Sequence, residues 1–320
     1  MSFRELAIKT IASVRPSLFY YKANASARAG IKVVQSDHAI DITRIADRKI
    51  IRISRINYIY LLDMIESFDY FFDSALPVTV QVGHEHYALV DFSTPRLHVV
   101  AGFDDFAVLC PSLTEPFSSI QQYLDFASLS PGDVVFDLGA YSALTSVAFS
   151  KAVGPSGKVV ALEPDPMNFR AATYNIARNL QHNGLQNIKL LPAAVADRPG
   201  VLQLSSEGAM GSSLTSIVGR HRGTVIDVDC VTLQGLVDAQ GLDKVDFIKM
   251  DIEGSELPVI LGSGEFLRRY MPRLIIEPHP IGGISTGGPI GEFLESLGYD
   301  CEIIDQPGLS LPLLTARPPN

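Results

Sequence analysis

One pattern in the middle of the chain constrains the fold more than any other. An apolar run at 134–138 reaches a turn at Gly139, a helix-like segment covers 143–152, and a second apolar run covers 158–163. A buried strand, a tight turn, a crossover helix and a second strand form the repeating unit of a parallel sheet. The pattern therefore predicts an α/β domain that binds its ligand at the carboxyl ends of its strands.

The same alternation continues to the end of the chain and predicts a doubly wound, mostly parallel, seven-stranded sheet. The expected strands cover 134–138, 158–163, 188–194, 245–250, 273–278, 300–305 and 311–315. The expected helices cover 117–128, 143–152, 166–181, 255–270 and 289–297. Two further β-like runs, 201–205 and 224–231, interrupt the alternation and are interpreted as a hairpin-like insertion. We assign residues 116–320 to this Rossmann-like domain.

Residues 1–115 lack that alternation and are interpreted as a smaller α+β appendage. A helix through Ile65 and strand-like runs at 77–82, 87–92 and 97–101 predict a short antiparallel sheet. Apolar residues near helical spacing in the first segment predict a further helix, packed on a domain or partner or lying on a membrane surface. The appendage carries no chemical motif, so we expect it to shape an acceptor site or to mediate oligomerisation.

Composition narrows the classes of partner and location. The chain has 320 residues and a net charge of −9, and no dense Lys/Arg cluster could neutralise a run of phosphates, which argues against nucleic acid. Three widely spaced cysteines fit neither a disulfide framework nor a metal-binding pair, so we expect a reducing, cytoplasmic setting. No run of 18 apolar residues is present, and no transmembrane segment is expected.

The turn after the first strand indicates which kind of adenosine cofactor fits. Glu163 ends the neighbouring strand, where a carboxylate can accept hydrogen bonds from ribose hydroxyls. The turn contains the single Gly139 in place of the three glycines that a pyrophosphate loop uses. Asp137 before it would repel a pyrophosphate but attract an ammonium group. These features favour S-adenosylmethionine over a nicotinamide dinucleotide, although ordinary strand-end polar residues remain an alternative reading of both acids.

Six sequence blocks resemble the FkbM-type methyltransferases, a class I, Rossmann-like family that uses S-adenosylmethionine. The blocks are DLGAYSALTS at 137–146, ALEPDPMNF at 161–169, AAVAD at 193–197, GSSL at 211–214, VDFIKMDIEGSE at 245–256 and IIEPHP at 275–280. The resemblance implies O-methylation of a sugar or another small-molecule hydroxyl. Ala143 departs from it, because such sequences often carry a second glycine there. The predicted cofactor contacts are Asp137, Gly139, Ala140, Tyr141, Ser142, Glu163, Pro164, Ala194 and Asp251.

Two clusters at strand ends are candidates for removing the acceptor proton. Asp251 follows one strand, while Glu277 and His279 end the next, and an imidazole titrates near neutral pH. We predict His279 as general base, with Asp251 and Glu277 beside it, although a structural histidine is the alternative. A divalent metal such as magnesium on Asp251, Glu253 and Glu277 is left open and is not indicated by any motif. Glu256 is interpreted as a first-turn helix acid and is left out of the catalytic set.

The sequence therefore predicts an S-adenosylmethionine-dependent O-methyltransferase with a small-molecule or saccharide acceptor, and leaves a homo-oligomer open. Two alternatives remain at this stage. One is a nicotinamide-dependent oxidoreductase, which would share the sheet and the ribose-binding acid. The other is a non-catalytic module that retains the cofactor fold to contact a partner protein.

Overall fold

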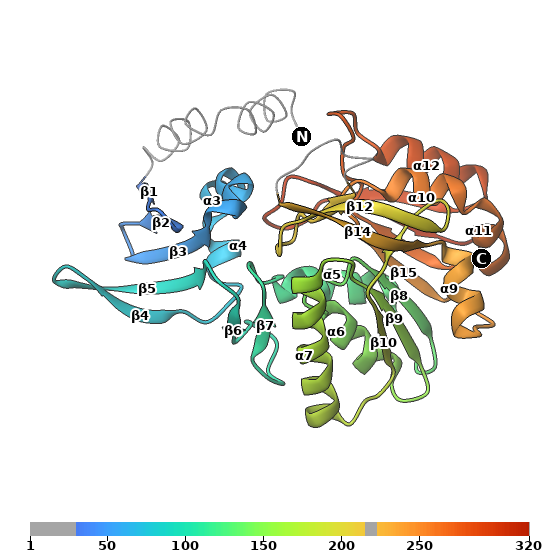
Figure 1. Cartoon of the computed structure of the whole chain (residues 1–320), viewed down its shortest axis with the longest axis horizontal. Helices are drawn as coiled ribbons and strands as arrows, with labels where there is room; N and C mark the ends of the chain where they lie inside the picture. Colours follow the sequence, from blue (N-terminus) through green and yellow to red (C-terminus); the bar gives the residue numbers. More distant parts are fainter. Residues whose placement is uncertain (1–29, 215–222, 320) are drawn as a thin grey trace. The chain divides into compact units, whose positions relative to one another are not determined.

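The computed structural model describes residues 30–214 and 223–319 (Figure 1). The chain divides into two compact units. The first comprises Met1–Ser118 with Pro307–Ser310, and the second comprises Ser119–Gln306 with Leu311–Asn320. The helix expected in the first segment lies outside the described residues. Each unit is described below by itself.

A seven-stranded sheet organises the second unit, in the order β10-β9-β8-β15-β16-β18-β17. The first five strands of this order run parallel, and β18 pairs antiparallel with both β16 and β17. The prediction of a doubly wound, mostly parallel sheet is confirmed. The strand bounds are Val134–Leu138 (β8), Lys158–Leu162 (β9), Ile188–Leu191 (β10), Phe247–Met250 (β15), Arg273–Ile276 (β16), Asp300–Ile304 (β17) and Leu313–Arg317 (β18).

Alternating side chains of the central strands pack into two separate cores, because successive residues of a strand point to opposite faces. In β8, Phe136 joins one core and Val135 joins the other; in β15, Ile248 and Phe247 divide in the same way. The core containing Phe136 also includes side chains of α9–α12, whereas the core containing Val135 includes side chains of α5 and α6. Helices therefore cover both faces of the sheet.

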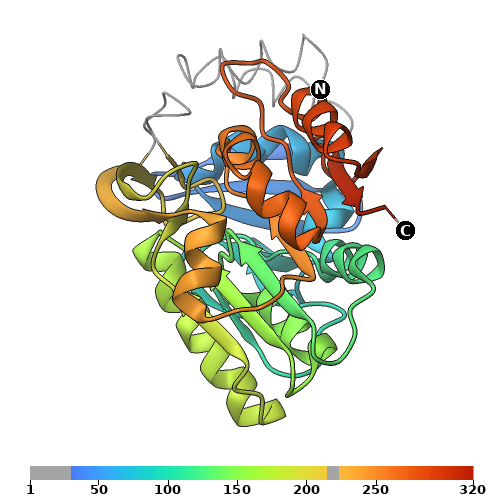
Figure 2. The same cartoon turned by 90° about the vertical axis from the view of Figure 1, so that its right-hand side faces the viewer.

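The helices largely follow the expected segments. Their bounds are Phe117–Ala127 (α5), Leu144–Val153 (α6), Pro166–Asn183 (α7), Leu233–Gln240 (α9), Glu256–Gly262 (α10), Gly264–Tyr270 (α11) and Gly287–Ser296 (α12). The long α7 follows β9 and is visible along its length in Figure 2. The prediction of a single helix over 255–270 is wrong, because the helix is interrupted at Ser263, between α10 and α11. Helix α9 was not predicted.

The two runs that interrupted the alternation form a second, four-stranded sheet of order β11-β14-β12-β13. Strands β12 (Gly200–Ser206) and β14 (Thr224–Val231) pair antiparallel, as the hairpin-like interpretation expected. The short β13 (Ser213–Leu214) adds to β12, and β11 (Ala194–Val195) pairs parallel with β14. The strand predicted over 188–194 is therefore too long, because β10 ends at Leu191 and Ala194 belongs to the second sheet.

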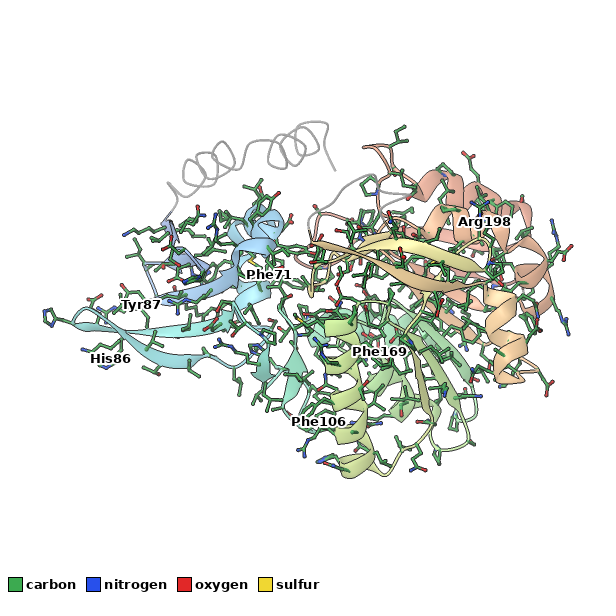
Figure 3. The ribbon with its side chains drawn as sticks, in the orientation of Figure 1. Phe71, His86, Tyr87, Phe106, Phe169 and Arg198 are labelled. Atoms are coloured by element: carbon green, nitrogen blue, oxygen red, sulfur yellow. The ribbon has the colours of Figure 1, made fainter. Side chains whose placement is uncertain are left out.

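The first unit contains a five-stranded sheet of order β1-β2-β3-β5-β4 and a two-stranded sheet of β6 with β7. The strands are Ile31–Gln35 (β1), Ala39–Arg44 (β2), Lys49–Ser54 (β3), Val78–Val82 (β4), Glu85–Phe92 (β5), Arg96–His98 (β6) and Val108–Cys110 (β7). The expectation of a purely antiparallel sheet is wrong, because β3 pairs parallel with β5. Figure 3 labels His86 and Tyr87 on the β4–β5 ribbon.

Short helices follow β3 in the first unit. They are η2 (Arg55–Tyr60), α3 (Leu61–Glu66) and α4 (Phe68–Phe72), and their buried side chains include Leu61, Met64 and Phe71. Within the described parts of the chain, no helix has both the length and the hydropathy needed to cross a membrane.

Candidate active site

The turn between β8 and α6 brings two backbone segments into close approach at Gly139. This residue has a φ of +81°, in the left-handed region that favours glycine. A Cβ placed on Gly139 would lie 1.8 Å from the carbonyl oxygen of Asp251, at the carboxyl end of β15. Any side chain here would collide with backbone, so the close approach of the two strand ends requires glycine.

The rest of this turn is held in an unusual backbone conformation. Tyr141 and Ala143 have φ values of 48° and 60°, which side-chain-bearing residues rarely adopt. The Ala143 N–H donates to the Ala140 carbonyl at 2.6 Å, and the Ser142 carbonyl accepts from the Asn175 side chain at 2.8 Å. The left-handed φ of Ala143 gives a physical reason why a glycine is common at this position in the sequences that the chain resembles.

Glu163 closes the turn from the neighbouring strand. Its carboxylate accepts hydrogen bonds from the N–H of Tyr141 at 2.7 Å and the N–H of Asp165 at 2.8 Å. The Asn168 side chain donates to it at 3.4 Å. Glu163 is almost fully buried, and this burial raises the pKa of its carboxyl group to about 8. The acid expected to bind ribose thus sits directly against the backbone of the β8–α6 turn.

Asp165 anchors a second loop beside Glu163. One of its oxygens caps α7 by accepting from the N–H of Met167 at 2.8 Å. The other accepts from the hydroxyls of Ser206 and Ser212, both at 2.8 Å, and from the N–H of Gly208 at 3.0 Å. Asp165 therefore ties the loop after β12 to the turn that presents Glu163.

Asp137 lies under the same turn and is fully buried. One oxygen accepts from the Ser146 hydroxyl at 2.5 Å, and the other lies 3.7 Å from the ammonium of Lys249. Burial raises the pKa of Asp137, against the opposing effects of Lys249 and Ser146. Lys249 also donates to the Gly139 carbonyl at 2.8 Å and lies 3.6 Å from an Asp251 oxygen. This lysine therefore links Asp137, the glycine turn and Asp251.

A tight turn after β15 presents the first of the two strand-end clusters. Glu253 has a φ of 55°, and Glu256, the first residue of α10, accepts hydrogen bonds from the N–H groups of Ile252 at 3.1 Å and Gly254 at 3.1 and 3.2 Å. Glu256 is fully buried. Its carboxylate thus stabilises the turn from the buried side. The side chains of Asp251 and Glu253 in the same turn are 25% and 21% exposed.

His279 follows β16 and faces this turn. Its Nδ1 lies 3.0 Å from Glu256 Oε1 and 3.1 Å from the Glu277 carbonyl oxygen. Its Nε2 lies 3.6 Å from a Glu253 oxygen and 3.7 Å from a Glu277 oxygen. Burial by itself would lower the pKa of His279, but the surrounding carboxylates outweigh burial and raise it well above its ordinary value.

Glu277 completes the cluster. Burial, followed by the charge of Asp251, raises the pKa of Glu277 to about 8, and a hydrogen bond with Gln306 opposes that rise. The predicted Asp251, Glu277 and His279 therefore come together, with donor atoms within 4.8 Å of one another, a spacing that one divalent cation could bridge. The metal set left open from the sequence was Asp251, Glu253 and Glu277. In the structure His279 takes the place of Glu253 in this group, and a Glu253 oxygen lies 3.6 Å from His279 Nε2.

Comparison with known proteins gives this arrangement a family. The family model of the methyltransferase FkbM domain matches residues 137–301, which is more than half of the chain and spans both strand-end clusters. The chain belongs to the FkbM methyltransferase family. The FkbM resemblance inferred from the sequence is thereby confirmed, and S-adenosylmethionine is the cofactor.

Curated relatives agree with this assignment. The chain is 26% identical over 206 residues to the methyltransferase sdnD of Sordaria araneosa, covering 55% of this chain and 77% of the relative. It is 25% identical over 175 residues to the 2-O-methyltransferase NoeI of Sinorhizobium fredii, covering 49% and 69%. It is 26% identical over 184 residues to the 31-O-demethyl-FK506 methyltransferase FkbM of Streptomyces tacrolimicus, covering 48% and 68%.

A solved methyltransferase FkbM from Methylobacillus flagellatus is also similar. It is 16% identical with a TM-score of 0.42, and the match covers 61% of this chain and 50% of that one.

The buried groups of this FkbM domain fit S-adenosylmethionine. Glu163 has a carboxylate that could accept hydrogen bonds from ribose hydroxyls, and it lies against the backbone of the turn at Tyr141. The Ser142 hydroxyl is buried and has no hydrogen-bond partner among the described residues, so it can serve a ligand at the turn. The turn contains no row of glycines for a pyrophosphate.

The predicted cofactor residues fall into two groups. Those of the β8–α6 turn, with Glu163 and Pro164 after β9, are adjacent in the fold, and the carbonyl of Asp251 reaches Gly139. Ala194 lies in β11, beyond β10, in the four-stranded sheet. Sequence reasoning did not identify Ser146, Asp165 and Asn168 as supports of the β8–α6 turn and its neighbours. It also missed Glu256 as a partner of His279 and Gln306 as a partner of Glu277. The block DIEGSE was the one available signal for Glu256, and it was interpreted as helix capping.

Proposed function

We propose that this FkbM-family methyltransferase acts on oxygen, transferring a methyl group to a hydroxyl of a small-molecule or saccharide acceptor. The proposal is supported by the acceptor-side cluster, in which Asp251, Glu253 and Glu277 surround His279. Carboxylate oxygens accept hydrogen bonds from hydroxyl groups and repel anions. Two of the relatives are named as O-methyltransferases, which agrees with this choice of atom.

The first part of the proposed mechanism is binding and orientation. S-adenosylmethionine, when bound, supplies an electrophilic methyl group on a positively charged sulfur. Glu163 would hold the ribose, and the turn at Gly139 with Tyr141 and Ser142 would lie against the methionine end. The transfer is an in-line displacement, so the acceptor oxygen must be held on the axis of the breaking bond. In the proposal, the carboxylate of Asp251, which follows β15, orients the acceptor hydroxyl; its backbone carbonyl lies against Gly139.

The second part is removal of the hydroxyl proton. In the proposal, the acceptor oxygen loses its proton to Nε2 of His279 as the new bond to the methyl carbon forms. Glu253 and Glu256 stabilise the resulting imidazolium, as the raised pKa of His279 indicates. The raised pKa also favours the protonated ring, which cannot accept the proton. The neutral, reactive imidazole therefore forms in larger proportion as the pH rises.

Asp137 and Lys249 would act on the cofactor end through the turn. Lys249 holds the Gly139 carbonyl and pairs with both Asp137 and Asp251. A direct contact between Asp137 and the methionine ammonium stays a prediction. So does an acceptor-binding or oligomerisation role for the first unit.

A labelled-methyl experiment tests the proposal. The purified protein is incubated with S-adenosylmethionine carrying a labelled methyl group and with extract fractions separated into anionic, neutral and cationic small molecules. We expect label in the neutral, polyhydroxylated fraction, as an ether that resists mild base. Label in a base-labile methyl ester or on an amine nitrogen would contradict O-directed transfer to a hydroxyl.

The same assay separates a base mechanism from a metal-dependent one. EDTA should leave the transfer rate unchanged if His279 acts as the base. A rate that falls with EDTA and recovers with magnesium would instead assign Asp251, Glu277 and His279 to a metal ion.

A further inference from the structure

Glu256 is fully buried, whereas the side chains of Asp251, Glu253 and Glu277 in the acceptor-side cluster are partly exposed. Glu256 also accepts more hydrogen bonds than helix capping requires. Its two oxygens receive the N–H groups of Ile252 and Gly254, inside the turn that precedes α10. One of the same oxygens lies 3.0 Å from His279 Nδ1. A single carboxylate thus joins the turn after β15 to the histidine after β16.

The two neighbours of His279 Nδ1 determine where that nitrogen's proton resides. Glu256 Oε1 lies at 3.0 Å and the Glu277 carbonyl oxygen at 3.1 Å. A backbone carbonyl can only accept a hydrogen bond, and an ionised carboxylate can only accept as well. Nδ1 must therefore be the donor, in the neutral ring and in the imidazolium alike.

The opposite nitrogen has a different environment. The side-chain oxygens of Glu253 and Glu277 lie 3.6 and 3.7 Å from Nε2, too far for good hydrogen bonds. Asp251 lies beside them, and its own oxygen is 3.6 Å from Lys249. Nε2 therefore faces the part of the cluster in which a hydroxyl group could donate a hydrogen bond to it.

We propose that Glu256 is a positioning residue that keeps the proton on Nδ1 of His279 and leaves Nε2 as the nitrogen that exchanges a proton with the acceptor. The inference rests on the proposed function, in which His279 meets the acceptor hydroxyl. Glu256 does not touch the acceptor in this account. It acts through the histidine and through the turn that carries Asp251 and Glu253.

Two alternatives to this role are weaker on the geometry. A helix-capping acid would be satisfied by the N–H groups of Ile252 and Gly254 and would need no imidazole. A purely electrostatic acid could occupy a partly exposed site, as Glu253 does, with its oxygen beyond hydrogen-bond distance of the ring. Only a role in orienting the ring uses burial, both backbone contacts and the bond to Nδ1 together.

Nitrogen NMR on the full chain tests the inference without knowledge of the acceptor. The protein is labelled with ¹⁵N-histidine, and the His279 signals among the seven histidines are assigned by their loss in His279→Gln. The pH is then raised until the ring loses a proton. We expect Nε2 to lose it and Nδ1 to remain protonated. A wild-type ring that keeps the Nε2 proton and loses the Nδ1 proton would overturn the inference.

Variants at Glu256 separate positioning from support of the fold. Glu256→Ala leaves the Glu277 carbonyl as the remaining acceptor at Nδ1, so a larger share of the rings should take the other tautomer. The kcat should fall about 10-fold or more with little change in KM. Glu256→Gln, whose amide oxygen can still accept from Nδ1, should restore the wild-type tautomer and part of the rate. Glu265→Gln, an exposed first-turn acid of α11, is the matched control and should change neither. Wild-type tautomer and kcat in a folded Glu256→Ala protein would also overturn the inference.

Calorimetric binding of S-adenosylhomocysteine keeps this test distinct from the proposed function. All Glu256 variants should bind it as the wild type does, because the hydrogen-bond partners of the Glu256 carboxylate are Ile252, Gly254 and His279. A wild-type protein that fails to bind it would count against the proposed function, whereas the tautomer measurement would still decide the role of Glu256.

Discussion

The two ends of the proposed active site are built by different physical means. At the carboxyl ends of β8 and β9, the site consists largely of backbone. Gly139 lies against the Asp251 carbonyl, and Glu163 accepts hydrogen bonds from two backbone N–H groups. At the carboxyl ends of β15 and β16, it consists of charged side chains around His279. Backbone geometry suits a cofactor that all members of a fold share, whereas side-chain charge can be varied to suit an acceptor. Changes at the two ends should therefore fail in different ways.

The largest expected effect is on the acceptor end. Replacing His279 with Gln removes the proposed base and should lower the rate of methyl transfer to the acceptor found by labelling about 100- to 10,000-fold. Binding of S-adenosylhomocysteine should stay unchanged, because the side-chain partners of His279 are Glu253, Glu256 and Glu277. His182→Gln, at an exposed position near the end of α7, serves as the control. A loss of cofactor binding that matches the loss of rate would contradict the claim that the two ends act independently.

The next effect concerns the backbone at the cofactor end. Gly139→Ala places a Cβ 1.8 Å from the Asp251 carbonyl oxygen, and should lower the free energy of unfolding by about 3 kcal/mol, with loss of cofactor binding. Gly241→Ala is the matched control, since Gly241 has a left-handed φ of +59° and a Cβ added there would have nothing within 4 Å. That control should cost about 1 kcal/mol. Urea unfolding measures both, and equal losses would show that the close approach at Gly139 is unimportant.

A smaller effect is expected from the charge of Glu163. Glu163→Gln removes an acceptor of ribose hydroxyls and should weaken binding of S-adenosylhomocysteine about 10- to 100-fold, as a hydrogen bond to a charged group contributes about 1.5–3 kcal/mol. Calorimetry measures the change. Glu302→Gln, on the exposed side of β17, should have no effect. Unchanged affinity in Glu163→Gln would remove Glu163 from the cofactor site.

The smallest effect is the pH dependence of that same affinity. Burial raises the pKa of Glu163 to about 8 in the free protein, so its carboxyl group is protonated below that pH. Ribose hydroxyls donate to the ionised form, so binding releases a proton below pH 8. Affinity for S-adenosylhomocysteine should therefore rise with pH, by about tenfold in all between about pH 7 and pH 9, and level off above that range. The rise attributable to Glu163 should be missing from Glu163→Gln, and an identical slope in both proteins would contradict this assignment.

The comparison also explains what the sequence could and could not predict. Strands of the seven-stranded sheet were predictable because each is a short apolar run at a regular interval, and Gly139 with Glu163 was predictable because both lie at strand ends. The partner of His279 was not, since nothing in the spacing of Glu256 shows that its carboxylate turns inward toward a residue on another strand. The parallel pairing of β3 with β5 depends on tertiary contacts in the same way.

Two helix boundaries were predicted incorrectly. The segment 255–270 has a continuous helical pattern, but Ser263 adopts a non-helical conformation with a φ of −105° and separates α10 from α11. The glycine that FkbM-type sequences often carry at position 143 was the one sign of a left-handed φ there, because alanine itself ordinarily favours a helix. In both places tertiary packing overrides the intrinsic preference of the residue.

Calorimetry with two cofactors tests the central claim most directly. The folded full chain is titrated with S-adenosylhomocysteine and, separately, with NAD. The site built by Gly139 and Glu163 should give a saturable signal with S-adenosylhomocysteine, weakened in Glu163→Gln, and none with NAD. A folded protein that binds NAD at this site, or that gives no signal with S-adenosylhomocysteine, would contradict the account.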